Sequence, residues 1–340
     1  MRTKGNLIVE NRPLIAITMG DPSGIGPEII VKGLTTPLDV CRTVVIGDAA
    51  WLQQHASQWA PQLSIRPIKD LSEARHEPGI LNVLDLHNVP ENLHVGRATS
   101  EGGKAAVEYI RKAVELATAH QVHAITTAPI NKEAMHLAGF KYPGHTEMLA
   151  DFTRTPEVAL MLAGGSLRVV LTTTHVPLSE VRNLLTRDRI LKTIRLTHQW
   201  LTQVGVEHPR LVVTGLNPHS GDGGIFGDEE IETIIPAIEA AQKENIEVAG
   251  PFSADALFGR IHEASYDAVI TMYHDQGMIP VKMASMDRAV NITLGLPIIR
   301  TSVDHGTAFD IAGQGIAKPD SLLEALKVAA TLAQSSLVSQ

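Results

Sequence analysis

The chain has little cysteine, few aromatic residues and no long apolar run. Its 340 residues include one cysteine, Cys41, so no disulfide can form within the chain and a reducing, cytoplasmic location is expected. Aromatic residues make up 4% and hydrophobic residues 44%, which predicts an aliphatic core of the kind formed by parallel strands and helices. No apolar stretch approaches the ~18 residues of a membrane span, so no membrane association is expected.

Positive charge is also scarce. The formal net charge is −8 and no basic block is present. Nucleic-acid phosphates require clustered Lys and Arg, so a nucleic-acid partner is excluded. An anionic small molecule remains compatible with this composition if a few cations are placed locally.

The order of the predicted elements indicates an α/β fold. Strands are expected over residues 13–19, 44–47, 81–86, 123–127, 158–163, 168–173, 210–214 and 267–272. Helices are expected over residues 48–59, 100–119, 187–204, 228–243 and 321–332, with two more beginning near residues 27 and 143. Ser100 is the predicted N-cap of the helix over residues 100–119. The Gly164-Gly165 turn predicts a hairpin. A chain of this length favours two subdomains over one core.

A glycine-rich loop, GDPSGIGPE, follows the first predicted strand and opens a helix with Pro27 in its first turn. It is not a dinucleotide fingerprint, because Glu28 and Ile29 stand where a third glycine would be needed. A tight turn and a ligand-binding loop remain equal alternatives for this segment.

Three histidines, His175, His219 and His274, each lie just past the carboxyl end of a predicted strand. In one parallel sheet they would face the same edge, and such a set suits a catalytic divalent metal such as Zn²⁺. The chain contains 15 histidines and shows no HExxH or CxxC motif, so ordinary surface or core histidines are the alternative.

Polar residues are concentrated between residues 266 and 313. Lys282 and Arg300 fit an anionic substrate, with ordinary ion pairing as the alternative. His145 and Thr146 open a predicted helix whose N–H groups suit a phosphate, although Thr146 as a simple N-cap is equally compatible. Asp255 follows a Gly-Pro turn, and the alternative to a functional role is that it only caps a helix.

A turn-rich segment, residues 302–313, contains His305, Gly306 and Asp310. Its glycine lets the backbone approach a ligand closely. The Asp310 carboxylate has the chemistry to accept hydrogen bonds from a ribose diol while repelling a 2′-phosphate.

Several motifs, in their order, resemble the 4-hydroxythreonine-4-phosphate dehydrogenase family over about residues 13–332. They are GDPSGIGPE, PGHTE, TTTHVPL, GLNPHSGDGG, MYHDQG and VNITLGLPIIRTSVDHGTAFDIAG. GDPSGIGPE and HGTAFDIAGQGIAKP are also similar to the wider isocitrate and isopropylmalate dehydrogenase group. This resemblance implies a two-domain α/β fold with mixed sheets and no Rossmann fingerprint. It also implies a homodimer whose active sites lie at the subunit boundary.

The resemblance assigns residues by position. The first domain would comprise residues 1–129 and 285–340, and the second residues 130–284 with the metal ligands and dimer contacts. The implied ligands of a divalent metal (Zn, Mg, Mn or Co), one supplied by the partner chain, are His175, His219 and His274. The implied substrate contacts are His145, Thr146, Lys282, Asn291 and Arg300. The loop implied to bind the adenosine half of NAD contains His305, Gly306 and Asp310.

PINKEAMHLAGFKYPGHTEML and DHGTAFDIA are closer to the 4-phospho-D-threonate dehydrogenase branch of the family than to its vitamin B6 branch. The expected reaction oxidises 4-phospho-D-threonate or 4-phospho-D-erythronate at C3 and releases CO₂, giving dihydroxyacetone phosphate. Oxidation of 4-hydroxythreonine-4-phosphate in pyridoxal phosphate biosynthesis is the alternative. Lys282 is a general acid or base if it is desolvated, and otherwise a phosphate-binding cation; Asp255 is the other candidate catalytic residue. A non-catalytic phosphate or sugar-acid binding module and an acyl- or phosphotransferase are the rivals from other classes.

Overall fold

The computed structural model describes residues 12–261, 265–285 and 288–338. Internal contacts divide the chain into two compact units: unit 1 comprises the described residues up to Pro156 together with Leu296–Val338, and unit 2 lies within Glu157–Gly295. These bounds differ from the expected domains at both junctions. Residues 130–156 belong to unit 1, where α5 (Lys132–Leu137) packs on α4 (Ser100–Thr118). The described residues between 285 and 295 belong to unit 2, where the last strand of that unit joins its sheet.

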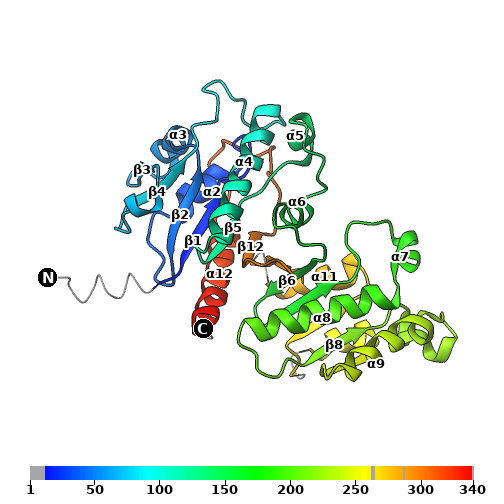
Figure 1. Ribbon diagram of the computed structural model, residues 1–340. Coiled ribbons are helices and arrows are strands. Elements are labelled where there is room, and N and C mark those ends of the chain that lie inside the picture. Colours follow the sequence, from blue (N-terminus) through cyan, green and yellow to red (C-terminus); the bar gives the residue numbers. More distant parts are fainter. Residues whose placement is uncertain (1–11, 262–264, 286–287, 339–340) are drawn as a thin grey trace. The chain divides into compact units, whose positions relative to one another are not determined.

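Unit 1 is built on a parallel sheet (Figure 1). Its strands are β1 (Leu14–Thr18), β2 (Arg42–Gly47), β3 (Ser64–Ile68), β4 (Ile80–Asp85), β5 (Ala124–Thr127) and β12 (Arg300–Val303), in the spatial order β3-β4-β2-β1-β5-β12. All five residues of β1 are buried, as expected for a central strand covered on both faces. The chain leaves β1 toward β2 and later returns on the other side of β1 as β5, so a topological switch point lies between these two strands. Ligands of such sheets bind beyond the carboxyl ends at this point.

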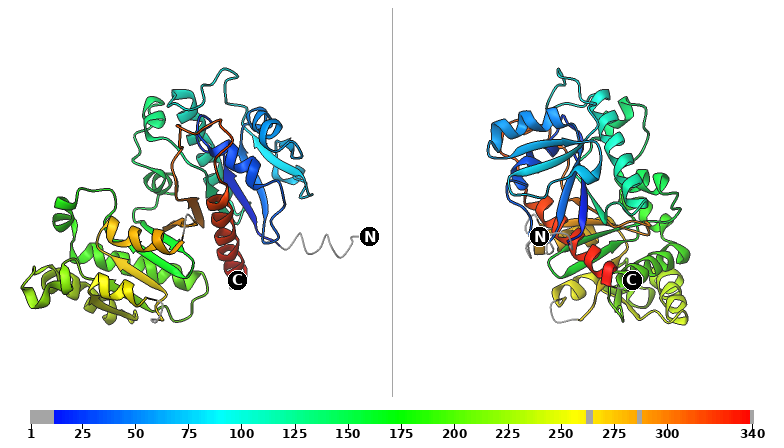
Figure 2. Two further views of the ribbon diagram at one scale, coloured as in Figure 1. Left: turned by 180° about the vertical axis from the view of Figure 1, so that it is seen from behind. Right: turned by 60° about the vertical axis from the view of Figure 1, so that its left-hand side comes forward.

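Helices cover both faces of this sheet. α2 (Gly26–Gly33) contacts both α3 (Ala49–Trp59) and α12 (Asp320–Val338), so these three helices form one layer. α12 packs on β12, β5 and β1, and Figure 2 shows it in red alongside the strands. The crossover through α4 runs in the opposite direction, and right-handed connections therefore place α4 on the other face. A short 3-10 turn, η1 (Leu71–Glu73), and α6 (His145–Phe152) complete the helical segments of unit 1.

The N-cap of α4 is Thr99, and the prediction of Ser100 was wrong. Thr99 has an extended backbone and its Oγ1 accepts a hydrogen bond from the Gly102 N–H at 3.0 Å, so Ser100 is already the first helical residue.

Unit 2 contains a mixed sheet. Its strands are β6 (Ala159–Gly164), β7 (Leu167–Leu171), β8 (Leu211–Thr214), β9 (Val248–Phe252), β10 (Ala268–Thr271) and β11 (Val290–Leu294), in the order β11-β6-β7-β10-β8-β9. β6 is antiparallel to β7 and β11, whereas the remaining neighbours are parallel. The predicted hairpin at residues 164 and 165 is confirmed, with Gly165 in the left-handed region at φ 60°.

The helical segments of unit 2 connect these strands. They are α7 (Leu178–Leu184), α8 (Arg187–Gln203), η2 (Pro218–Gly224), the π-helical turn η3 (Glu230–Ile234), α9 (Ile235–Lys243), α10 (Ala254–Gly259) and α11 (His274–Ser285). The α/β class predicted from the sequence is therefore confirmed in both units. Among the described helices, none combines the length and the apolar character needed to cross a membrane.

α11 was not predicted, because Gly277 and Pro280 interrupt its apolar pattern. The glycine is required by close packing. A Cβ added to Gly277 would lie 2.6 Å from Leu171 Cδ2 and 2.7 Å from both Val169 Cγ1 and Thr271 Oγ1. The first turn of α11 therefore rests directly on β7 and β10.

Candidate active site

The three candidate metal ligands follow three adjacent parallel strands of unit 2. β10 pairs with β7 on one side and with β8 on the other, with Thr271 opposite Leu171 and Ile270 opposite Val213. The carboxyl ends of the three strands are therefore level. The segments that leave these ends carry His175, His219 and His274.

Two of these segments remain paired beyond the sheet. The Thr172 N–H donates to the Thr271 carbonyl at 2.8 Å, and Thr173 Oγ1 donates to the Met272 carbonyl at 2.7 Å. The structure thereby brings His175 and His274 together, with 5.5 Å between their ring centroids.

The His274 ring is oriented by the neighbouring carboxylate. His274 is the first residue of α11, and its Nδ1 lies 2.7 Å from Asp275 Oδ1. An ionised carboxylate can only accept at this contact, so Nδ1 is the donor and Nε2 is the ring nitrogen left for another partner. This carboxylate–imidazole arrangement is the one that orients metal-ligating histidines.

His219 lies in a left-handed stretch of backbone within η2. The φ values of the non-glycine residues are 54° at His219, 51° at Ser220 and 44° at Asp222. Each such residue costs about 1–2 kcal/mol, and strained conformations of this kind concentrate at functional sites. The His219 ring also lies 6.1 Å from the Phe226 ring.

Asp255, the other candidate catalytic residue, belongs to the same part of unit 2 as His219. The Ser253 hydroxyl holds the pKa of the Asp255 carboxyl below its usual value, and the Ala256 N–H and the charge of His219 act in the same direction. The carboxyl is thus ionised at neutral pH. This state suits attraction of a cation and does not suit a general acid. Ser253 occupies the N-cap position of α10, so the alternative of Asp255 as the cap residue does not hold.

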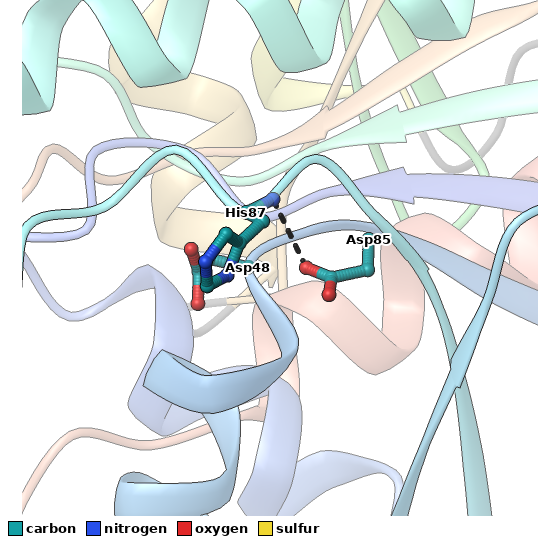
Figure 3. Close-up of side chains that lie close together, drawn as sticks. All are labelled: Asp48, Asp85 and His87. Atoms are coloured by element: carbon teal, nitrogen blue, oxygen red, sulfur yellow. Dashed lines mark hydrogen bonds between the residues drawn. The ribbon is translucent and has the colours of Figure 1, made fainter.

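The described residues contain one group of three close metal-ligating side chains, and it is not the predicted set. Asp48, Asp85 and His87 offer ligand atoms within 4.8 Å of one another (Figure 3). Their carboxylates already bind backbone N–H groups. Asp48 accepts from Trp51 at 2.9 Å and from Val89 at 3.0 Å, and Asp85 accepts from the His87 N–H at 3.1 Å. We interpret this group as the cap of α3 and its adjoining turn.

In unit 1, the buried guanidinium of Arg300 lies near the half-buried His145. Arg300 is 3% exposed and donates to Thr127 Oγ1 at 2.8 Å. Burial lowers its pKa to about 9, with Glu147 opposing the shift, so it remains charged at neutral pH. Burial, and then the charge of Arg300, hold the pKa of His145 well below its usual value. A cation beside a neutral imidazole can bind an anion.

α6 begins at His145 behind Gly144, and no described side chain caps its first turn. The alternative in which Thr146 serves only as the N-cap is therefore wrong, because Thr146 is the second helical residue. His145 Nε2 is buried and has no hydrogen-bond partner among the described residues. Both features leave donors available for a ligand at this helix start.

The glycine-rich loop after β1 holds the segment predicted to bind the cofactor. The Ile25 N–H donates to the Thr307 carbonyl at 3.0 Å, and a Cβ added to Gly24 would lie 2.9 Å from the same oxygen. Farther along α2, the buried Glu28 carboxylate accepts from the Ala317 N–H at 2.7 Å, and Lys32 Nζ donates to the Gly315 carbonyl at 2.9 Å. The middle of the 302–313 segment is thus fixed to the start of α2, and the residues that follow the segment are fixed to the body of that helix.

Within that segment His305 Nδ1 lies 3.1 Å from the Gly306 carbonyl, and His305 Nε2 is buried with no partner among the described residues. Gly306 and Asp310 are exposed. Next to it, Asp21 links the ends of β1 and β5, since its N–H donates to the Pro129 carbonyl at 2.9 Å. Burial raises the pKa of the Asp21 carboxyl to about 6.

The predicted substrate contacts are divided between the units. His145, Thr146 and Arg300 belong to unit 1, whereas Lys282 and Asn291 belong to unit 2. Lys282 is exposed in the last turn of α11, so unit 2 does not provide the desolvation that an acid–base role requires. Its position favours the phosphate-binding alternative.

A cavity of about 390 Å³ lies at the opposite edge of the sheet of unit 1, at the amino ends of β2 and β4. None of the predicted site residues lines it. The chemistry suggested by the sequence therefore does not belong to this cavity.

Unit 2 carries imidazoles and carboxylates after its strand ends, and unit 1 carries a buried guanidinium near an imidazole. Groups of these kinds are found in α/β enzymes that act on small anionic molecules. Residues 39–329 match the family described as pyridoxal phosphate biosynthetic protein PdxA. The chain belongs to this family. The protein is therefore an oxidoreductase of the dehydrogenase type.

Relatives carry two different names. A 4-hydroxythreonine-4-phosphate dehydrogenase of Desulforapulum autotrophicum is 48% identical over 95% of this chain and 96% of its own. A D-threonate 4-phosphate dehydrogenase of Cupriavidus necator is also 48% identical, over 94% of this chain and 97% of its own.

Solved structures agree with the fold. The crystal structure of a 4-hydroxythreonine-4-phosphate dehydrogenase from Klebsiella pneumoniae matches with a TM-score of 0.90 and 44% identity, covering 95% of this chain and 99% of that one. A more distant β-decarboxylating dehydrogenase from Thermococcus kodakarensis, at 14% identity and a TM-score of 0.50, shares the fold alone.

Proposed function

We propose that the protein is an NAD-dependent, metal-requiring dehydrogenase that oxidises and decarboxylates 4-phospho-D-threonate or 4-phospho-D-erythronate. Hydride would leave C3 for the nicotinamide, and the resulting β-keto acid would lose CO₂ to give dihydroxyacetone phosphate. The observation that carries this proposal is the level edge formed by β7, β10 and β8, from which His175, His219 and His274 follow. The dehydrogenase family weighs against a non-catalytic binding module and against a transferase.

The donor set fits a divalent cation. The rings of His175 and His274 are 5.5 Å apart, and Asp275 leaves His274 Nε2 as the ligating atom. The described chain does not bring the three ligand atoms within 4.8 Å of one another, which is compatible with one ligand coming from a partner chain. When bound, Zn²⁺, Mg²⁺, Mn²⁺ or Co²⁺ would supply Lewis-acid assistance to proton loss from the alcohol and to loss of CO₂.

The remaining groups have binding roles in this proposal. The buried guanidinium of Arg300, His145 and the uncapped start of α6 would bind the phosphate or carboxylate of the substrate, together with Lys282 and Asn291. The 302–313 segment, with His305, Gly306 and Asp310, would bind the adenosine half of NAD.

A homodimer with shared active sites is part of the proposal. Unit 2 exposes large apolar side chains, including Met283 at 78% and Ile225 at 74%. Met283 and Ile279 lie on α11, the helix that carries His274 and Lys282. Exposed apolar groups beside a candidate site are typical of an interface. The single, buried cysteine is compatible with a cytoplasmic location.

Oxidation of 4-hydroxythreonine-4-phosphate in pyridoxal phosphate biosynthesis is the second candidate, favoured by the names of the Desulforapulum and Klebsiella relatives. Parallel turnover assays that follow NADH absorbance with 4-phospho-D-threonate, 4-phospho-D-erythronate and 4-hydroxythreonine-4-phosphate would decide between them.

The His219→Ala variant tests the metal. Turnover should fall on the order of 10²-fold or more, because a ligand is lost. His208→Ala, an exposed histidine of unit 2, is the matched control and should be unaffected. Near-normal turnover of the wild type after chelation would remove the metal from the proposal.

A further inference from the structure

The ends of β8 and β10 are joined by one side chain, the amide of Gln276. Its Oε1 accepts from Thr214 Oγ1 and from the Met272 N–H, both at 2.8 Å. Its Nε2 donates to the Gly215 carbonyl at 2.7 Å. Gln276 therefore fixes the segment that precedes His274 against the segment that leads to His219.

A second side chain, that of Glu230, holds the segment that leads to His219. It is 2% exposed. Its Oε1 accepts from the N–H groups of Leu216 at 2.7 Å and Asn217 at 2.8 Å, and its Oε2 accepts from Asn217 Nδ2 at 2.9 Å. A Cβ added to Gly221 would lie 2.8 Å from Glu230 Oε2, so the loop closes directly over the carboxylate.

These contacts explain how the left-handed loop that contains His219 keeps its shape. His219, Ser220 and Asp222 all have positive φ, a conformation that non-glycine residues adopt only when the surroundings fix it. Charge-assisted hydrogen bonds to a buried carboxylate are among the stronger contacts available for this purpose.

We propose that Glu230 and Gln276 are positioning residues that set the geometry of the metal site by holding the loops of His219 and His274. Neither is a metal ligand in this proposal. The inference rests on the proposed function, because it assumes that the three histidines bind a divalent cation. Residues that orient ligands in this way typically change metal affinity about 10- to 100-fold when they are altered.

The test is a titration of chelator-treated full-length protein with Mn²⁺, with the free ion measured by electron paramagnetic resonance. Glu230→Gln keeps the shape but places an NH₂ group opposite the Asn217 amide. We expect its Mn²⁺ affinity to fall about 10- to 100-fold. Glu232→Gln is the matched control, since it makes the same change at an exposed position of the same turn and should bind Mn²⁺ like the wild type.

Thermal unfolding of the metal-free proteins separates positioning from a purely structural role. If Glu230→Gln lowers the unfolding midpoint but binds Mn²⁺ like the wild type, the inference is overturned. If this variant does not fold, Gln276→Glu, which removes the donor to the Gly215 carbonyl, is judged by the same criterion. If the wild type itself binds no Mn²⁺, both the inference and the proposed metal dependence fail, whereas unchanged affinity in the variants of a metal-binding wild type refutes the inference alone.

Discussion

Replacing Gly277 by alanine tests how closely α11 must approach the sheet. The added methyl group would lie 2.6 Å from Leu171 Cδ2 and 2.7 Å from Val169 Cγ1, whereas carbon atoms normally approach to about 3.5–4.0 Å. Thr271 Oγ1 of the neighbouring strand β10 would also lie 2.7 Å away. The helix must therefore move by roughly 1 Å, because one rotamer change cannot relieve clashes with both β7 and β10. Overpacking of this kind costs about 1–3 kcal/mol.

Helix propensity acts in the other direction, since alanine is favoured over glycine by about 1 kcal/mol inside a helix. With clashes against both strands we expect the upper end of the overpacking range, which leaves a net loss of about 2 kcal/mol in the free energy of unfolding.

Urea unfolding of the Gly277→Ala variant measures this loss. Gly259→Ala is the matched control, because it is also a helical glycine of unit 2 and a Cβ there would meet nothing within 4 Å. We expect the control to be neutral or slightly stabilised. The reasoning on close packing is refuted if Gly277→Ala is as stable as the control.

Three further predictions follow from the contacts described above. Glu28→Gln should lower the free energy of unfolding by about 1.5–3 kcal/mol in urea titrations, since it weakens charged hydrogen bonds to the 315–317 backbone. Glu324→Gln, at a half-exposed position of α12, should change little. Because the folded-state pKa of Asp21 is raised from 3.8 to about 6, its contribution to stability is present below the unfolded value and lost as pH rises through 6. Asp21→Asn should therefore gain about 2 kcal/mol relative to the wild type between pH 4 and pH 7, and parallel pH profiles of the two proteins would contradict this. Met283→Asp should yield monomers in light scattering, and an unchanged mass would count against α11 as the dimer contact.

Sequence patterns predicted those elements that are determined by residues close together in the chain. The Gly164-Gly165 turn between two apolar runs correctly predicted the β6–β7 hairpin. Strand-end placement correctly put His175 and His274 beside each other, because parallel neighbours share one edge.

Other helices and strands were not predicted, because they contain residues that usually interrupt such elements. α11 contains both Gly277 and Pro280, and β3 is an edge strand in which Pro67 is tolerated. Glycine and proline are helix and strand breakers on average, and only tertiary packing explains their presence here.

The residues that support the site carry no local signal. Glu28 meets Ala317, 289 positions away in the chain, and Glu230 reaches back over a whole loop to Leu216. Such pairings depend on topology and not on periodicity. Gln276 could in principle have been noticed, since it follows His274 by two residues, but its partners are Thr214, the last residue of β8, and Gly215 just after it.

The attachment of the 302–313 segment, and of the residues that follow it, to α2 has a thermodynamic consequence. Ordering a free loop costs roughly 1–2 kcal/mol of backbone entropy per residue. Here that loss occurs during folding, since Ile25 already holds the segment at Thr307, and Glu28 holds the residues just after it, without any ligand. A molecule binding to this surface would therefore meet a prearranged partner and would keep more of its interaction energy as affinity.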